Sequence, residues 1–224
     1  MIYRESFAGE AEGRRCGEAY YHSKDEKYTV CVLTGIGDRP IRRLLNYGGW
    51  IERAVGEMLL RNADRFMNVG GEEIVQDICN FMYSCIGFDV PGDVTERTSL
   101  LGKTWLIVLY SWQSGKLLFM NVGNGAIWTI RQGQDEILAG EANFRRRERA
   151  AAEAGIIDAK GLTDESVVLC TGGARKILFE DAEVKPWIID LLEAGEPDQV
   201  CQYLEMNHPD EERGFLFFEL KDEE

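Results

Sequence analysis

Several charged side chains that could bind a metal ion or a phosphate group stand close to glycine-rich turns in this sequence. Carboxylates are the oxygen ligands that Mg²⁺ and Mn²⁺ prefer, and an arginine guanidinium matches a phosphate group with two parallel hydrogen bonds. The candidates are Arg14, Glu18, Asp38, Asp210 and Glu211. A simpler interpretation stays open: Arg14 and Arg15 as a solvated turn, Asp38 as a cap, and the last two acids as a loop.

Three apolar runs of strand-like composition end in turns rich in glycine. These turns begin at Thr34 (Thr-Gly-Ile-Gly), at Asn121 (Asn-Val-Gly-Asn-Gly) and at Thr171 (Thr-Gly-Gly). Runs rich in Val, Leu, Ile and Phe that are bounded by Gly and Asn are typical of strands. The sequence therefore predicts three strand ends that carry short turns.

In order and spacing these turns resemble the D-G-x-G-G, N-V-G-D-S and S-D-G motifs of the PP2C-type (PPM) metal-dependent protein serine/threonine phosphatases. The segment Arg14-Arg-Cys-Gly-Glu-Ala resembles the R-x-x-N-E-D opening of that family. The resemblance covers nearly the whole chain, from Gly13 to Leu220. It implies an α+β fold, a four-layer α-β-β-α sandwich of two antiparallel sheets flanked by helices. We expect one such domain over residues 1–224.

The resemblance also implies where the metal ligands of the family would stand, and most of those positions hold no carboxylate. Ala19 stands for the aspartate of the opening motif, Thr34 for the aspartate that bridges two metal ions, and Gly172 for a further metal aspartate. These neutral side chains cannot offset the charge of two divalent cations held close together. The resemblance therefore predicts that the metal pair is lost, and we expect no metal and no cofactor.

Other functional positions of the family are retained in kind. Arg14 corresponds to the arginine that binds substrate phosphate, and Glu18 corresponds to the acid beside the metal site. Gly35 corresponds to the glycine whose carbonyl contributes to the site, and Glu211 falls near the last acidic ligand. Asn121 begins a turn that is mostly structural in the family, so its survival supports the fold and says little about activity.

The pattern of losses predicts a catalytically impaired pseudophosphatase that acts as a binding or regulatory module for a phosphorylated or protein partner. In active relatives two metal ions lower the pKa of a bridging water and so supply the nucleophile. The alternative is an active serine/threonine phosphatase of bacterial type with a rearranged Mg or Mn site. That site would use Glu18 with Asp38, Asp210 or Glu211 as compensating carboxylates. A third possibility is a structural subunit of a larger assembly.

Composition limits the partners and the compartment. The 224 residues, 45% of them hydrophobic, are enough for one sizeable domain. The net charge of −14 repels a phosphate backbone, so we expect no nucleic-acid partner. No apolar run approaches the roughly 18 residues of a transmembrane helix, and the first residues lack the pattern of an export signal. We expect a cytoplasmic signalling protein that does not bind membranes.

Cysteines and basic residues add two minor expectations. The six cysteines lie mostly in apolar runs and form no C-x-x-C pair, which predicts reduced, buried thiols rather than a zinc site. The basic segment that begins at Arg145 (Arg-Arg-Arg-Glu-Arg) is the densest cationic cluster of the chain. It is interpreted either as a solvated helix face with i,i+4 ion pairs or as a docking patch for an acidic or phosphorylated partner.

Hydrophobic periodicity and turn residues predict the element order. Grouped strands, then two helices, then grouped strands indicate two antiparallel sheets with helices outside them. The predicted strands are residues 3–7, 19–22, 28–33, 104–112, 117–122, 126–131, 136–138, 166–170 and 214–220. The predicted helices are residues 44–59, 72–85, 142–154, 185–192 and 197–206.

Overall fold

The computed structural model describes residues 19–36, 50–86, 103–140, 152–159, 165–208 and 213–220. Within these ranges the strands form two antiparallel sheets. The first sheet has the order β1-β2-β3-β4-β7 and the second has the order β6-β5-β8-β9. The strands are β1 (Ala19–Lys24), β2 (Tyr28–Ile36), β3 (Lys103–Ser111), β4 (Lys116–Val122), β5 (Ala126–Arg131), β6 (Gln134–Ala139), β7 (Ala152–Asp158), β8 (Glu165–Cys170) and β9 (Phe215–Leu220).

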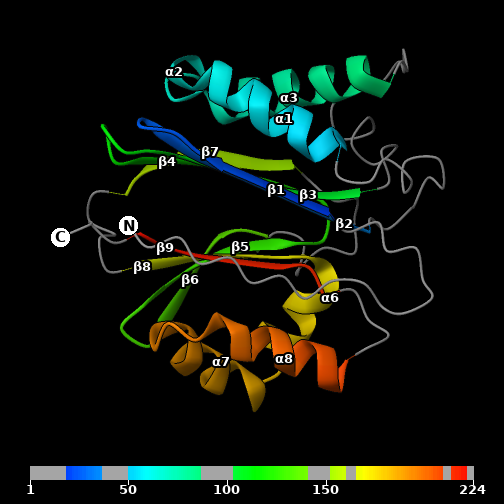
Figure 1. Cartoon of the computed structure of the whole chain (residues 1–224), viewed down its shortest axis with the longest axis vertical. Coiled ribbons are helices and arrows are strands. Elements are labelled where there is room, and N and C mark those ends of the chain that lie inside the picture. Colours follow the sequence, from blue (N-terminus) through cyan, green and yellow to red (C-terminus); the bar gives the residue numbers. More distant parts are fainter. Residues whose placement is uncertain are drawn as a thin grey trace.

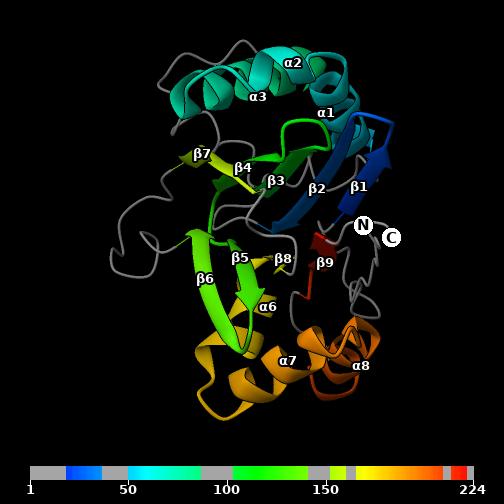
Figure 2. The same cartoon turned by 90° about the vertical axis from the view of Figure 1, so that its left-hand side faces the viewer.

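Helices cover the outer face of each sheet, so the molecule has four layers (Figure 1). The first sheet is covered by α1 (Trp50–Arg61), α2 (Ala63–Phe66) and α3 (Gly71–Ile86). The second is covered by α6 (Gly172–Arg175), the π-helical turn η1 (Lys176–Glu180), α7 (Val184–Glu193) and α8 (Pro197–Asn207). Figure 2 shows the two helical layers at opposite ends of the molecule. The predicted α+β sandwich is confirmed. Among the described residues, no helix has the length and apolar character needed to cross a membrane.

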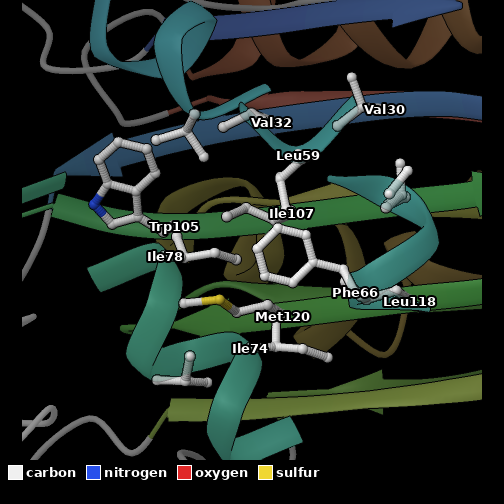
Figure 3. Packing of buried hydrophobic residues seen from close by; sticks show 14 of the residues in the cluster. Val30, Val32, Leu59, Phe66, Ile74, Ile78, Trp105, Ile107, Leu118 and Met120 are labelled. Carbon is white, nitrogen blue, oxygen red and sulfur yellow. The ribbon is translucent and has the colours of Figure 1, made fainter. Parts of the chain in front are cut away.

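Strand β2 shows how the sequence builds this layered core. Val30 and Val32 lie beside Leu59 of α1 and belong to the hydrophobic cluster between the first sheet and its helices, as Figure 3 shows. Cys31 and Leu33 alternate with them and belong to the cluster between the two sheets. Because successive side chains of a strand point to opposite faces, a strand buried on both faces must be apolar at every position. This explains the unbroken apolar run before Thr34.

A third hydrophobic cluster lies between the second sheet and α6–α8. Trp128 of β5 stacks on Phe179 of η1 with the ring centroids 4.6 Å apart. Beside this stack the Lys185 ammonium forms an ion pair of 2.8 Å with Asp135 of β6. Burial of large aromatic rings is a major source of stability in such a layer. The helices after β8 are therefore fixed to the sheet by packing along their inner faces.

One prediction of secondary structure was wrong, and some short helices were not predicted. Residues 152–158 form strand β7, whereas the sequence analysis assigned residues 142–154 to a charged helix. Ala152, Ala154 and Ile156 alternate along this strand and pack on the cluster under α1–α3, and β7 pairs with β4. Alternation of short apolar residues was misread because Ala and Glu favour helices. The short helices of residues 172–180 were not predicted either.

The predicted burial of cysteines is confirmed where the structure describes them. Cys31, Cys79, Cys170 and Cys201 are buried. Burial raises the pKa of the Cys170 thiol well above its usual value, although the nearby Arg175 charge opposes this. A nucleophilic or metal-binding cysteine acts as the thiolate. Cys170 is therefore a packing residue and not a nucleophile.

Tyr28 ties the first sheet to the helical layer and gives the fold a testable pH dependence. Its hydroxyl donates a hydrogen bond to Oδ1 of Asp64 in α2, and its side chain is 8% exposed. The hydrogen bond to Asp64, burial and the charges of Asp64 and Asp25 raise the pKa of Tyr28 from 10.0 to about 12. The folded state therefore keeps the phenol proton between those pH values while the unfolded state loses it.

We expect replacement of Tyr28 by Phe to lower the free energy of unfolding by about 1 kcal/mol at pH 9. The stabilisation is present below pH 10 and is lost as the pH rises towards about 12. Urea unfolding of both proteins at pH 9 and pH 11.5 measures this difference. A gap between the two proteins that stays constant over this range would show that the hydroxyl of Tyr28 does not titrate as described.

Candidate functional site

The three glycine-rich turns meet at one end of the sandwich. Gly35 lies opposite Thr104 in the pairing of β2 with β3. The Thr104 hydroxyl donates a hydrogen bond of 2.6 Å to Oδ1 of Asn124, in the turn after β4. The Asn124 side chain lies against Gly172, at the start of α6, and α6 and the end of β2 are on the same side of the molecule (Figure 1). The turn cluster, as we call it, consists of residues 34–35, 104, 121–125 and 171–172.

The segment before the last strand reaches the turn cluster as well. The backbone N–H of Thr171 donates a hydrogen bond of 2.9 Å to the carbonyl oxygen of Gly214. This contact brings the chain that precedes β9 to the start of α6. Five predicted site residues lie outside the described ranges, namely Arg14, Glu18, Asp38, Asp210 and Glu211.

Two positions of the lost carboxylates are direct neighbours across the first sheet. Ala19 and Thr34 are partners in the antiparallel register of β1 and β2. Side chains at paired positions of adjacent strands lie on the same face and within contact distance. The structure therefore brings together the two positions that the sequence analysis placed in one metal site, and neither carries a carboxylate.

Thr34 is engaged with an acidic residue that sequence reasoning missed. Its hydroxyl donates a hydrogen bond of 2.7 Å to Oε1 of Glu52, in the first turn of α1. Both residues are fully buried, with 0% of each exposed. A hydrogen bond to a carboxylate is stronger than one between neutral groups. Glu52 is thus a buried acid at the end of β2, beside the position of the bridging aspartate.

A signal for Glu52 was present in the sequence. Glu52, Val55, Gly56 and Leu59 recur at the i, i+3, i+4, i+7 spacing of one helix face. All four are buried. A carboxylate on the buried face of a helix is strongly unfavourable unless it has polar partners. A glutamate at this position of the apolar pattern therefore indicates a buried polar contact.

Asn124 fills the space that a side chain at position 172 would occupy. A Cβ atom added to Gly172 would lie 2.5 Å from Cγ of Asn124 and 2.5 Å from its Nδ2. These distances are shorter than any normal contact, so a side chain at this position would displace the amide. The hydrogen bond from Thr104 holds the amide in this place. A neutral amide therefore stands where the resemblance places a metal-binding carboxylate.

The turn that begins at Asn121 is built as a close connection between the two sheets. The Asn121 side chain is buried, and its Nδ2 donates a hydrogen bond of 3.1 Å to the carbonyl oxygen of Gly125. Gly123 has a φ of +108°, and a Cβ added there would lie 2.7 Å from the Thr104 hydroxyl. Only glycine adopts this conformation without strain in so little space. The turn therefore has a structural role.

The described part of the turn cluster does not fit a pair of divalent cations. Mg²⁺ and Mn²⁺ are held by carboxylate oxygens, whereas this part offers the hydroxyl of Thr34, which is hydrogen-bonded to Glu52, and the Asn124 amide over Gly172. Among the described residues, no group of three or more His, Cys, Asp or Glu side chains is arranged to hold a metal ion.

Comparison with known proteins places this architecture. No protein-family model and no curated protein matches the sequence. Solved structures do match the fold. The phosphatase domain of the cell fate determinant SpoIIE from Bacillus subtilis has a TM-score of 0.55 and 10% sequence identity, and the match covers 96% of this chain and 90% of that domain. The Mycobacterium tuberculosis serine/threonine phosphatase PstP has a TM-score of 0.59 and 10% identity, over 99% and 98%.

The chain has the PP2C-type phosphatase fold. RsbX, solved in complex with magnesium, shares it with a TM-score of 0.54 and 12% identity, over 96% of this chain and 92% of that one. The PP2C-like fold that the turn motifs predicted is thereby confirmed. At these identities the likeness shows the fold alone. The activity of this PP2C-like chain has to be argued from its own residues.

Proposed function

We propose that this PP2C-like chain is a pseudophosphatase, a binding or regulatory module for a phosphorylated or protein partner. The observation that carries the proposal is the hydrogen bond between Thr34 and Glu52. It puts a neutral hydroxyl, already engaged by a buried acid, at the position of the bridging aspartate. The Asn124 amide over Gly172 supports the same conclusion at a second ligand position.

The electrostatic argument concerns the two metal ions of active relatives. RsbX was solved with magnesium, and an Mg²⁺ or Mn²⁺ pair needs several anionic oxygens to offset its charge. Ala19, Thr34 and Gly172 supply none. Without the metal pair, a bridging water keeps its ordinary pKa and is not a hydroxide at neutral pH. Hydrolysis of a phosphate ester then lacks its nucleophile.

Binding of a phosphorylated partner does not require the metal pair. Arg14 is the residue proposed to hold a phosphate group, through paired hydrogen bonds from its guanidinium. We expect the full chain to bind a phosphoserine peptide. Replacement of Arg14 by Ala is expected to weaken this binding at least about tenfold, which corresponds to the loss of one charged hydrogen bond. Unchanged affinity in the Arg14→Ala protein would remove phosphate binding from the proposal and leave the protein-partner role.

Turnover separates the proposal from its alternative. The full chain is expected to hydrolyse p-nitrophenyl phosphate or a phosphoserine peptide no faster with Mn²⁺ or Mg²⁺ than with a chelator. The matched control is the Glu18→Ala protein, which should give the same background rate. Metal-dependent turnover that disappears in Glu18→Ala would contradict the pseudophosphatase and identify an active phosphatase.

A second candidate function, an active phosphatase with a rearranged Mg or Mn site, is favoured by one observation. Glu52 places a buried carboxylate beside the Thr34 hydroxyl, at the end of β2. In this alternative Glu52 would act with Glu18, Asp38 and either Asp210 or Glu211 as ligands. Loss of metal-dependent turnover in Glu52→Gln would assign it that role, whereas an inactive parent chain excludes it.

A further inference from the structure

The outer surface of α7 and α8 carries exposed apolar side chains. Trp187 of α7 is 42% exposed and Met206 of α8 is 80% exposed. They are two of the four large hydrophobic side chains that are exposed in the described part of the chain. Figure 1 shows these two helices as the outermost layer below the second sheet. Trp187 and Met206 do not belong to the hydrophobic cluster between these helices and the second sheet.

Ring contacts link the two helices on this surface. The ring of Trp187 contacts Tyr203 of α8 edge to face, with the centroids 5.1 Å apart. Tyr203 also contacts the ring of His208, with the centroids 5.8 Å apart. Met206 follows Tyr203 by three residues and so lies on the same side of α8. The aromatic patch, as we call it, consists of Trp187, Tyr203, Met206 and His208.

The surroundings of the aromatic patch are strongly acidic. From Asp181 to His208 the sequence has one lysine, Lys185, and that lysine is paired with Asp135. Asp190 and Glu205 are both exposed: Asp190 follows Trp187 by three residues on α7, and Glu205 directly precedes Met206 on α8. The acids of this stretch are Asp181, Glu183, Asp190, Glu193, Glu196, Asp198 and Glu205.

This combination selects one class of partner. Exposed Trp, Tyr and Met are the side chains that most often anchor protein interfaces, and acids around them attract basic side chains. Lysine or arginine also binds favourably over aromatic rings. Nucleic acids and anionic lipid surfaces are repelled by the acids, and a second copy of this chain carries the same net charge of −14.

We propose that the aromatic patch of α7 and α8 is a docking surface for a basic, amphipathic helical segment of another protein. The apolar face of that segment covers Trp187 and Met206, and its lysines and arginines pair with Asp190 and Glu205. This proposal does not depend on the turn cluster, so it can fail while the pseudophosphatase proposal holds, and the reverse is also true.

The test uses the full chain and a fluorescent peptide about 18 residues long, made of Leu and Lys at helical spacing so that one face is apolar. The double variant Trp187→Ser/Met206→Ser is expected to bind this peptide at least about tenfold more weakly than the parent chain. The variant Asp190→Asn/Glu205→Gln is expected to bind about threefold to tenfold more weakly at low salt. Thermal unfolding is expected to show that all variants are folded, because the changed side chains are exposed.

The controls test whether binding is specific to the patch. Trp50, 50% exposed on α1 in the opposite helical layer, gives the matched variant Trp50→Ser, which is expected to bind like the parent chain. A peptide of the same composition with its leucines spread around the helix is expected to bind at least about tenfold more weakly. Equal affinity of the parent and the Trp187→Ser/Met206→Ser chain, or of the two peptides, would overturn the proposal.

Discussion

Replacing Gly172 by Asp is expected to lower the free energy of unfolding by about 3 kcal/mol, although it restores the residue of the S-D-G motif. The new Cβ would lie 2.5 Å from Cγ of Asn124, so the amide must leave and break its hydrogen bond with Thr104. The substitution also places a carboxylate at a buried position. Urea unfolding of the purified variant in the presence of a chelator measures the loss.

The matched background for this substitution is Asn124→Ala, which empties the space beside Gly172. In that background Gly172→Asp is expected to cost less than half of what it costs in the parent chain, because the overlap is gone and only burial of the acid remains. An equal cost in both backgrounds would show that the contact between Asn124 and position 172 does not decide which residue fits.

Replacing Thr34 by Val is expected to lower the free energy of unfolding by about 2 to 3 kcal/mol. Val has nearly the same shape as Thr, so no cavity forms, but Oε1 of the buried Glu52 loses the hydroxyl that donates to it. Thr34→Ser keeps the hydroxyl and is expected to cost about 1 kcal/mol, mainly for the missing methyl group. Urea unfolding at pH 7 compares the three proteins.

A further variant shows whether the acid is the reason for that loss. In the Glu52→Leu background the hydroxyl of Thr34 has no carboxylate to donate to, and Thr34→Val is expected to have little further effect. A Thr34→Val protein as stable as the parent, or less affected than Thr34→Ser, would contradict the role of the hydrogen bond at the end of β2.

Much of the fold followed from local patterns. The apolar run of β2 predicted a strand, and the period of Ile74 and Ile78 predicted α3. Strand β7 was missed because it is held in place by its pairing with β4. Its first residues, Ala, Glu, Ala and Gly, do not show the β-branched and aromatic composition by which a strand is predicted. The short helices after Thr171 were missed because a four-residue α-helix continues into a π-helical turn. The buried residues of such a segment do not recur at the regular spacing of an α-helix.

The site was predictable in outline only. The resemblance to PP2C-type phosphatases implied that positions 19, 34 and 172 belong to one site, and the strand pairing and the contacts of Asn124 place them at one end of the sandwich. The partners of those positions were not predictable. Glu52 lies 18 residues after Thr34 on a helix, and Asn124 reaches position 172 only through the connection between the sheets. Such contacts depend on the tertiary structure and not on local spacing.

Titration calorimetry of the metal-free full chain with Mn²⁺ tests the central claim most directly, because it measures the binding of the two metal ions rather than their effect on catalysis. The neutral side chains at Ala19, Thr34 and Gly172 predict no binding of a pair of ions at concentrations up to about 0.1 mM. Binding of two Mn²⁺ ions per chain with micromolar or tighter affinity would contradict the account.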